Sequence, residues 1–260
     1  NPTSEIQCEQ IGFLSRNVRQ LSENSQCIEL ASAFRDAPLG DISDIVSDVF
    51  NHKREEIDLR VVFFDEPNDL LEKLTSELKK ELKNHYDDFD EDRIYYAFND
   101  WMGIGPGQSS NLERFQILSP FRKLEGLGTD DTNIHIQSIL RGGFLNKRGL
   151  NNVSGFTIQD KIMINKNMTF YSGYNHETKE GKVRVDLANG QFGQVIKLYS
   201  REVRGDKVFP KRAMVKFPEV GENVTLNVPA KMASEIFELG YATTIHKAQG
   251  SEFEVVFMVL

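Results

Sequence analysis

The pattern of hydrophobic and polar positions changes twice along the chain and divides it into three parts. Residues 1–155 show apolar runs that alternate with helical spacing, 156–229 show only short alternating segments, and 230–260 return to the first pattern. The clearest element is a helix with a leucine at every fourth position, namely Leu70, Leu74, Leu78 and Leu82. Pro67 suits its first turn, and the lysines near its end favour the helix dipole.

The other elements of the first part continue this alternation. Buried strands are predicted by three apolar runs, at 11–15, 60–64 and 114–118. Asn24-Ser25 can cap a helix that stops before Pro38, and Thr129 can cap another that ends at Gly142 and the glycine after it. Residues 84–110 carry an acidic run and a glycine-rich run, which predict an irregular solvated segment. Repeated strands and helices indicate a parallel sheet with crossover helices.

Residues 156–229 contain no helical period. Five strands are predicted there, at 160–164, 184–187, 192–196, 213–217 and 223–228. Asn189-Gly190 is a strong signal for a tight turn. This number and length of strands suit a small β-barrel. The part also has a local basic excess, formed by Lys197, Arg201, Arg204, Lys207, Lys211 and Arg212. An electrostatic track for nucleic acid and a solvated hairpin both explain that excess.

The third part holds the most apolar run of the chain. Residues 236–245 lead to a short helical piece at 246–250, and 254–260 are almost entirely apolar. Such a run predicts a central parallel strand that is buried on both faces. Because the run closes the sequence and the first residue is not Met, we expect a piece cut from a longer protein.

Composition and charge narrow the class of protein. The 260 residues are 39% hydrophobic, which allows one large domain or two modest ones. No apolar stretch has the length of a membrane span. The formal charge of −8 argues against a broadly basic nucleic-acid-binding surface, but not against a narrow basic track. Cys8 and Cys27 are too few for a disulfide framework and form no metal-ligand spacing, so we expect a cytoplasmic compartment and no structural metal.

The sharpest chemical signal is the segment 241–253, Tyr-Ala-Thr-Thr-Ile-His-Lys-Ala-Gln-Gly-Ser-Glu-Phe. Its pattern predicts a strand that runs into a polar turn and a short helix, and ligands of open α/β sheets bind at the carboxyl ends of such strands. A Thr and a His there can contact a sugar-phosphate backbone, and a Glu can accept a hydrogen bond from a hydroxyl. The segment resembles motif V of superfamily 1 helicases, in the form found in RecD-like enzymes. The alternative interpretation is an ordinary strand, turn and helix.

Two further segments lie in the order that this family has. Residues 14–20, Leu-Ser-Arg-Asn-Val-Arg-Gln, resemble motif IV, except that Val18 replaces the usual aromatic residue before the arginine. Residues 116–122, Gln-Ile-Leu-Ser-Pro-Phe-Arg, with glycines at 126 and 128 and Asn133 downstream, are similar to a strand and Ser-Pro turn of RecD-like proteins.

The middle part is also similar to RecD-like enzymes. Residues 160–163 and 185–195 resemble the small barrel that is inserted in their second motor domain and usually touches single-stranded DNA. Two departures weaken the expected DNA contacts. Gln191 stands where an acidic residue is usual, and the stretch 168–182 is longer than in the family pattern.

The resemblance implies an α/β fold, namely the second RecA-like parallel-sheet domain of a P-loop helicase with an inserted small SH3-like β-barrel. The RecA-like domain would comprise 1–155 and 230–260, and the barrel 156–229. The implied activity of the parent protein is ATP-dependent translocation along single-stranded DNA. Travel from 5′ to 3′ and a place in DNA repair or recombination also come from the resemblance alone.

The resemblance further implies the ligand-binding residues. ATP and Mg²⁺ would lie between this domain and an N-terminal RecA-like domain. Arg19 would be the catalytic residue, reaching the γ-phosphate, where a cation stabilises phosphoryl transfer. The other nucleotide-binding residues would be Gln20, Gln249, Gly250 and Glu252, with Glu252 on the ribose. The single-stranded DNA backbone would be held by Ser119, Arg122, Thr244 and His246.

Parts of a complete motor are missing from the sequence. It has no Gly-x-x-x-x-Gly-Lys-[Ser/Thr] phosphate cradle, and neither the acid pair of motif II nor motif VI is identifiable. We therefore expect ATP hydrolysis by the parent protein and none by these residues alone. Two alternatives stay open, a non-catalytic nucleic-acid-binding module and an RNA-directed superfamily 1 helicase. An independent hydrolase lacks a recognisable pair of nucleophile and base.

Overall fold

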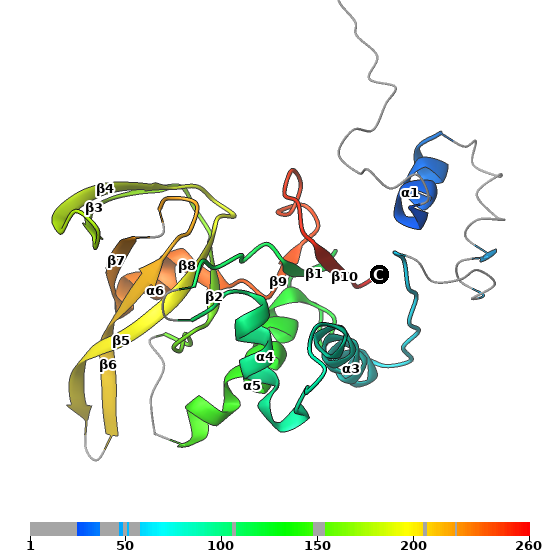
Figure 1. The fold of residues 1–260 in the computed structure, drawn as a ribbon, viewed down its shortest axis with the longest axis horizontal. Helices are drawn as coiled ribbons and strands as arrows, with labels where there is room; N and C mark the ends of the chain where they lie inside the picture. Colours follow the sequence, from blue (N-terminus) through cyan, green and yellow to red (C-terminus); the bar gives the residue numbers. More distant parts are fainter. Residues whose placement is uncertain are drawn as a thin grey trace, which may run out of the picture. The chain divides into compact units, whose positions relative to one another are not determined.

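A computed structural model shows how the chain folds (Figure 1). It describes residues 25–36, 47–48, 51, 58–105, 108–147, 154–204, 207–221 and 223–260. The chain divides into two compact units, Asn1–Phe63 and Phe64–Leu260, and each is treated by itself. In the first unit, α1 (Gln26–Asp36) begins after Ser25, whose Oγ accepts a hydrogen bond from the Ile28 amide at 3.2 Å. The predicted cap is confirmed at Ser25, whereas Asn24 and the strand predicted at 11–15 lie outside the described residues.

Residues 60–64 form no strand, so this prediction is wrong. Val62 and Phe63 are 37% and 54% exposed. An apolar run becomes a strand only when a neighbouring strand takes up its backbone hydrogen bonds. None of the strands described in the structure pairs with 60–64. The hydrophobic pattern identifies an apolar run, but it does not indicate whether a neighbouring strand is available to pair with it.

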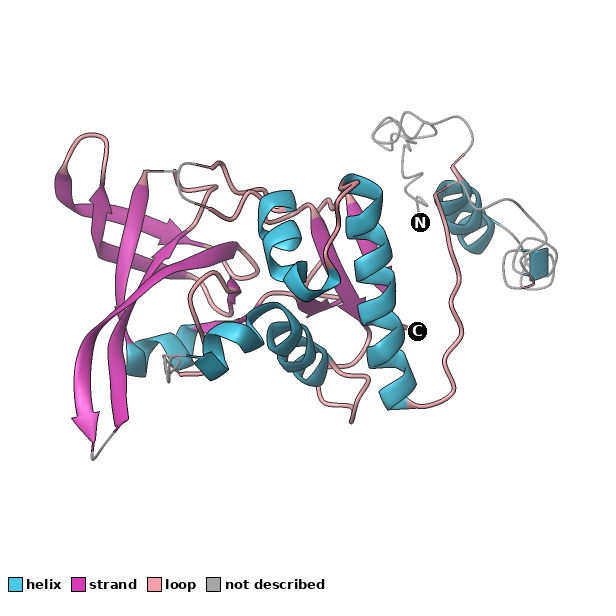
Figure 2. Cartoon of the chain, turned by 60° about the horizontal axis from the view of Figure 1, so that its bottom comes forward, coloured by secondary structure: helices cyan, strands magenta, loops and turns pink. Residues whose placement is uncertain are grey.

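Three helices of the second unit share one core with a small sheet (Figures 1 and 2). α3 (Pro67–His85) confirms the leucine helix, since its buried residues are the four predicted leucines. α4 (Ile94–Trp101) corrects the expectation of an irregular segment at 84–110, because its Phe98 and Trp101 face the same core. α5 (Thr129–Lys147) continues past Gly142, since an interior glycine costs a helix only about 1 kcal/mol.

The small sheet is parallel and has the order β10-β1-β9. β1 (Phe115–Ser119) lies in the middle and is buried along its whole length, as the pattern at 114–118 predicts. β9 (Ala242–Thr244) and β10 (Val255–Met258) flank it. β10 is therefore not the central strand expected from its apolar sequence. It is an edge strand among the described elements, and its Val256 and Met258 are 42% and 53% exposed.

The second sheet is antiparallel, with seven strands in the order β4-β3-β7-β6-β5-β2-β8. Their bounds are β2 (Lys161–Ile164), β3 (Met168–Asn175), β4 (Glu180–Leu187), β5 (Phe192–Arg204), β6 (Lys207–Lys216), β7 (Val224–Pro229) and β8 (Phe237–Leu239). The five predicted strands are present. β3 is an addition, and it fills the long stretch 168–182 by pairing with β4. The sheet continues past residue 229, because β8 belongs to it.

The antiparallel sheet does not close into the expected barrel, because no described pairing joins its edge strands β4 and β8. Short segments explain the open edge. β8 has three residues, and β3 meets β7 through only two residue pairs. The helix α6 (Ala230–Ile236) instead places Ala233 and Ile236 in the core of this sheet. Alternation along each strand predicted the buried faces but not whether the outer strands meet.

Candidate functional site

The carboxyl ends of β1 and β9 bring two of the sequence-predicted segments together. In the parallel register Ser119 lies opposite Thr244, and the Ile245 amide donates to the Ser119 carbonyl at 3.1 Å. Residues 245–250 form hydrogen-bonded turns rather than the predicted helical piece. His246 is exposed in these turns. Ser119, Thr244 and His246 therefore share one edge of the sheet, where ligands of parallel sheets bind.

Ser119 organises the loop that follows β1. Its side chain is fully buried, its Oγ donates to the Leu127 carbonyl at 2.9 Å, and it accepts from the Phe121 amide at 3.2 Å. Gly128 completes the loop, because a Cβ at this position would lie 2.4 Å from the Arg122 carbonyl oxygen. The hydroxyl of Ser119 is thus engaged within the protein, while Phe121 and Arg122 are exposed.

Glu238 of β8 connects the loop after β1 with the turns after β9. One of its carboxylate oxygens lies 3.3 Å from Arg122 Nη2, and the other forms a close ion pair with Lys247 Nζ. Arg122 also lies 3.5 Å from Asp130. Two cations from two strand ends are therefore held by one carboxylate. Sequence reasoning assigned Arg122 to DNA but missed Glu238 and Lys247 as its neighbours.

The predicted nucleotide-binding residues are only partly described. Arg19 and Gln20 lie outside the described residues. Gln249, Gly250 and Glu252 are exposed in the segment after β9, and Gly250 has a φ of +89°, which favours glycine. Nucleotide binding by these residues stays a prediction from the resemblance.

A buried polar network, which the sequence did not predict, lies at the other end of the parallel strands. Asp160 is fully buried and accepts from Gln137 Nε2 at 2.5 Å and from the Tyr241 hydroxyl at 2.9 Å. Arg141, also fully buried, places its Nε 3.6 Å from Asp160 Oδ1. Burial raises the pKa of Asp160 from 3.8 to about 6, although Arg141 and the hydrogen bonds oppose this rise.

Lys161 extends the buried polar network to β1. Its Nζ donates to the Phe115 carbonyl and to Gln116 Oε1, both at 2.8 Å, and lies 4.2 Å from the centre of the Phe192 ring. Burial lowers the pKa of Lys161 from 10.5 to about 7. Gln116 Nε2 in turn donates to the Tyr241 carbonyl at 3.1 Å. Since Asp160 and Lys161 are adjacent, the network closes on itself and ties β2 to the amino ends of β1 and β9.

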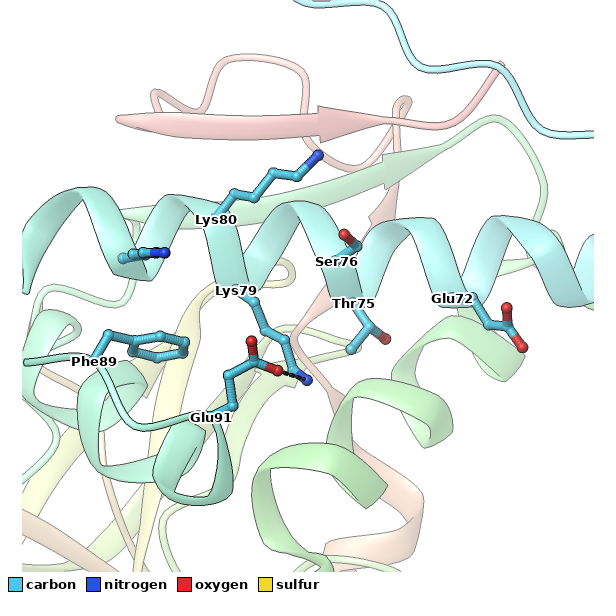
Figure 3. A pocket seen from close by; sticks show the side chains of 8 residues that line it. Glu72, Thr75, Ser76, Lys79, Lys80, Phe89 and Glu91 are labelled. Carbon is cyan, nitrogen blue, oxygen red and sulfur yellow. Dashed lines mark hydrogen bonds and ion pairs between the residues drawn. The ribbon is translucent and has the colours of Figure 1, made fainter.

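A groove of about 370 Å³ lies beside α3, away from these residues (Figure 3). Its lining consists of Glu72, Thr75, Ser76, Lys79, Lys80, Lys83, Phe89 and Glu91. Lys79 and Glu91 form an ion pair at 2.7 Å. None of the predicted DNA- or nucleotide-binding residues that the structure describes lines the groove, and charges of both signs share it, as on an ordinary solvated helix face. We assign no chemistry to it.

Among the residues that the structure describes, no group of three or more His, Cys, Asp or Glu side chains is arranged to hold a metal ion. No helix among them combines the length and the apolar character that crossing a membrane requires.

The chain was compared with known families and proteins. No protein-family model, no curated protein and no solved structure matches it.

Proposed function

We propose that this chain supplies the second motor domain of a superfamily 1 DNA helicase of the RecD type. One observation carries the proposal: two segments that resemble helicase motifs, far apart in the sequence, end side by side on the parallel sheet, where Ser119 lies opposite Thr244. The same edge carries Arg122 and His246, both exposed. An arginine and a histidine at such an edge can hold a phosphodiester backbone without reading its bases.

In the proposed mechanism, ATP binds between this domain and an N-terminal RecA-like domain. The N-terminal domain would supply the phosphate cradle and the Mg²⁺ site, which the sequence of this chain lacks. Arg19 and Gln20 would complete the site from this side, Glu252 would bind the ribose, and Gln249 and Gly250 would line the same cleft. Because motif V would face both ligands, ATP binding and hydrolysis would close and open the cleft and step this domain along the single strand.

A second candidate, a non-catalytic nucleic-acid-binding module, has one observation in its favour. Tyr171 and Tyr174 of β3 are 67% and 39% exposed on the antiparallel sheet. Exposed aromatic rings on a sheet can stack with unpaired bases. If this surface alone binds nucleic acid, substitutions at the strand ends of the parallel sheet will not affect binding.

The first test measures binding of a fluorescein-labelled oligothymidylate to the chain by fluorescence anisotropy over a range of salt concentrations. Arg122→Ala should weaken binding and reduce the slope of log K against log salt by about one, since one phosphate contact is lost. Arg93→Ala is the matched control, because Arg93 is an exposed arginine that also pairs with a carboxylate, Asp90. Equal effects of the two substitutions would contradict the proposed edge.

The second test separates the motor from the alternatives. ATP turnover of the natural full-length protein that carries these residues should require single-stranded DNA and disappear in Arg19→Ala, while DNA binding persists. Full-length protein that binds DNA but never turns over ATP would favour the binding module. Tighter binding to an RNA oligomer than to DNA of the same sequence would favour the RNA-directed helicase.

A further inference from the structure

Two cations stand at equivalent positions beyond the strand ends. Arg122 follows the last residue of β1, Ser119, by three positions, and Lys247 follows the last residue of β9, Thr244, by three positions. Since β1 and β9 are paired in register, both cations project from the same edge of the parallel sheet. A single carboxylate, that of Glu238, contacts both of them.

The neighbouring sheet holds Glu238 in place. Glu238 lies in β8, where it pairs with Met163 of β2, and its side chain is only 20% exposed. The cations are more accessible, at 55% for Arg122 and 27% for Lys247. Ion pairs at such exposure are weak, because water and salt screen them. An incoming anion can therefore replace this carboxylate, unlike the one of Asp160, which is closed in by the core.

We propose that Arg122 and Lys247 form a phosphate-binding pair for the single-stranded DNA backbone, and that Glu238 occupies this pair in the free protein. The inference rests on the proposed function, because it takes the ligand to be a nucleic-acid strand. A carboxylate and a phosphodiester are both oxyanions that accept hydrogen bonds from guanidinium and ammonium groups. The DNA phosphate displaces Glu238, so Glu238 limits the affinity for any strand, whatever its sequence.

The direction in which DNA affinity changes when Glu238 is replaced distinguishes two roles for this residue. If the carboxylate only stabilises the two strand-end loops, its loss will weaken DNA binding. If it competes with phosphate, its loss will strengthen binding. Glu238 makes two ion pairs of this exposure, and each corresponds to a factor of about 1.4 to 5 in affinity, so their removal corresponds to a gain of about twofold to thirtyfold.

The experiment compares Glu238→Gln with the wild-type chain in the oligothymidylate anisotropy assay. Glu235→Gln is the matched control, since it removes the same charge from an exposed residue of α6 three positions earlier. We expect tighter binding in Glu238→Gln, binding within twofold of wild type in Glu235→Gln, and loss of the gain when Arg122→Ala is added. Glu238→Asp, which withdraws the carboxylate by one methylene, should give an intermediate gain if Glu238→Gln does not fold.

The outcomes separate this inference from the proposed function. In one outcome the wild-type chain binds the oligonucleotide while Glu238→Gln binds it equally or more weakly. This result overturns the inference and leaves the proposed function standing. Equal gains in Glu238→Gln and Glu235→Gln also overturn it, because net charge would then explain both. Absence of binding in the wild type and in both Glu238 variants overturns inference and function together. Binding by the Glu238 variants alone supports the inference.

Discussion

Replacing Lys161 by methionine should change how the stability of the second unit depends on pH. The folded chain holds the pKa of Lys161 at about 7, and the unfolded chain returns it to 10.5. Between these values the unfolded state binds more protons than the folded state. Burial of Lys161 therefore costs free energy of folding, and this cost is full below pH 7 and disappears as the pH rises toward 10.5. At 1.36 kcal/mol per pKa unit, the penalty is about 4 kcal/mol at pH 7 and about 2 kcal/mol at pH 9.

Methionine removes this penalty but leaves two buried acceptors, the Phe115 carbonyl and Gln116 Oε1, without their donor. Each unsatisfied acceptor costs about 1–3 kcal/mol. The two effects nearly cancel at pH 7, so the variant should unfold there with a free energy close to that of the wild type. At pH 9 the variant should have lost about 2 kcal/mol relative to the wild type, because only the wild type gains from the change of pH.

Urea unfolding followed by Trp101 fluorescence measures this difference. Trp101 is the only tryptophan of the sequence and lies in the core of the second unit. Lys231→Met, at an exposed position of α6, serves as the control and should show the same pH dependence as the wild type. An equal difference between the free energies of unfolding of wild type and Lys161→Met at pH 7 and at pH 9, within about 0.5 kcal/mol, would refute the reasoning.

Three further predictions concern the buried polar network, the loop after β1 and the helix α5. Tyr241→Phe removes the hydroxyl that donates to Asp160 and should lower the free energy of urea unfolding by about 1–3 kcal/mol, whereas an unchanged value would mean that water takes the place of the hydroxyl. Gly128→Ala puts a Cβ 2.4 Å from the Arg122 carbonyl and should lower both the melting temperature and the DNA affinity. Gly142→Ala, with open space around its Cβ, should instead stabilise α5 by up to about 1 kcal/mol.

The sequence predicted those elements that can be recognised from their own hydrophobic pattern, without knowledge of their neighbours in the fold. α3 needs only leucines at every fourth position to bury one face, and β1 is recognisable from its apolar run. The edge strand β10 was misplaced because its apolar sequence describes the side chains and not the number of neighbouring strands. α4 was missed because its eight residues stand between an acidic run and a glycine-rich run that dominate the local pattern.

The candidate site was predicted to a similar extent. Parallel pairing brings the strand ends that precede Arg122 and His246 to one edge of the sheet, and DNA binding by these residues stays a prediction. Glu238 and the buried polar network were missed because single charged residues in a sequence are usually solvated, and only tertiary packing reveals burial. A signal was present nonetheless, since Asp160-Lys161 places two charges directly before the apolar residues of β2, where a solvated pair is not expected.

The pairing of β2 with β8 makes the antiparallel sheet an exchangeable module. The chain passes into that sheet through β2 and leaves it through β8, and these two strands are neighbours (Figure 1). The Asn165 amide even donates to the Ile236 carbonyl at 3.0 Å, so a short turn could join the two strands. Asp160 and Lys161 lie on the near side of this junction and would remain with the parallel sheet. Evolution or design can thus replace most of the chain between Asn165 and Ile236 without rerouting the strands that carry the candidate site, provided that Phe192 continues to pack against Lys161.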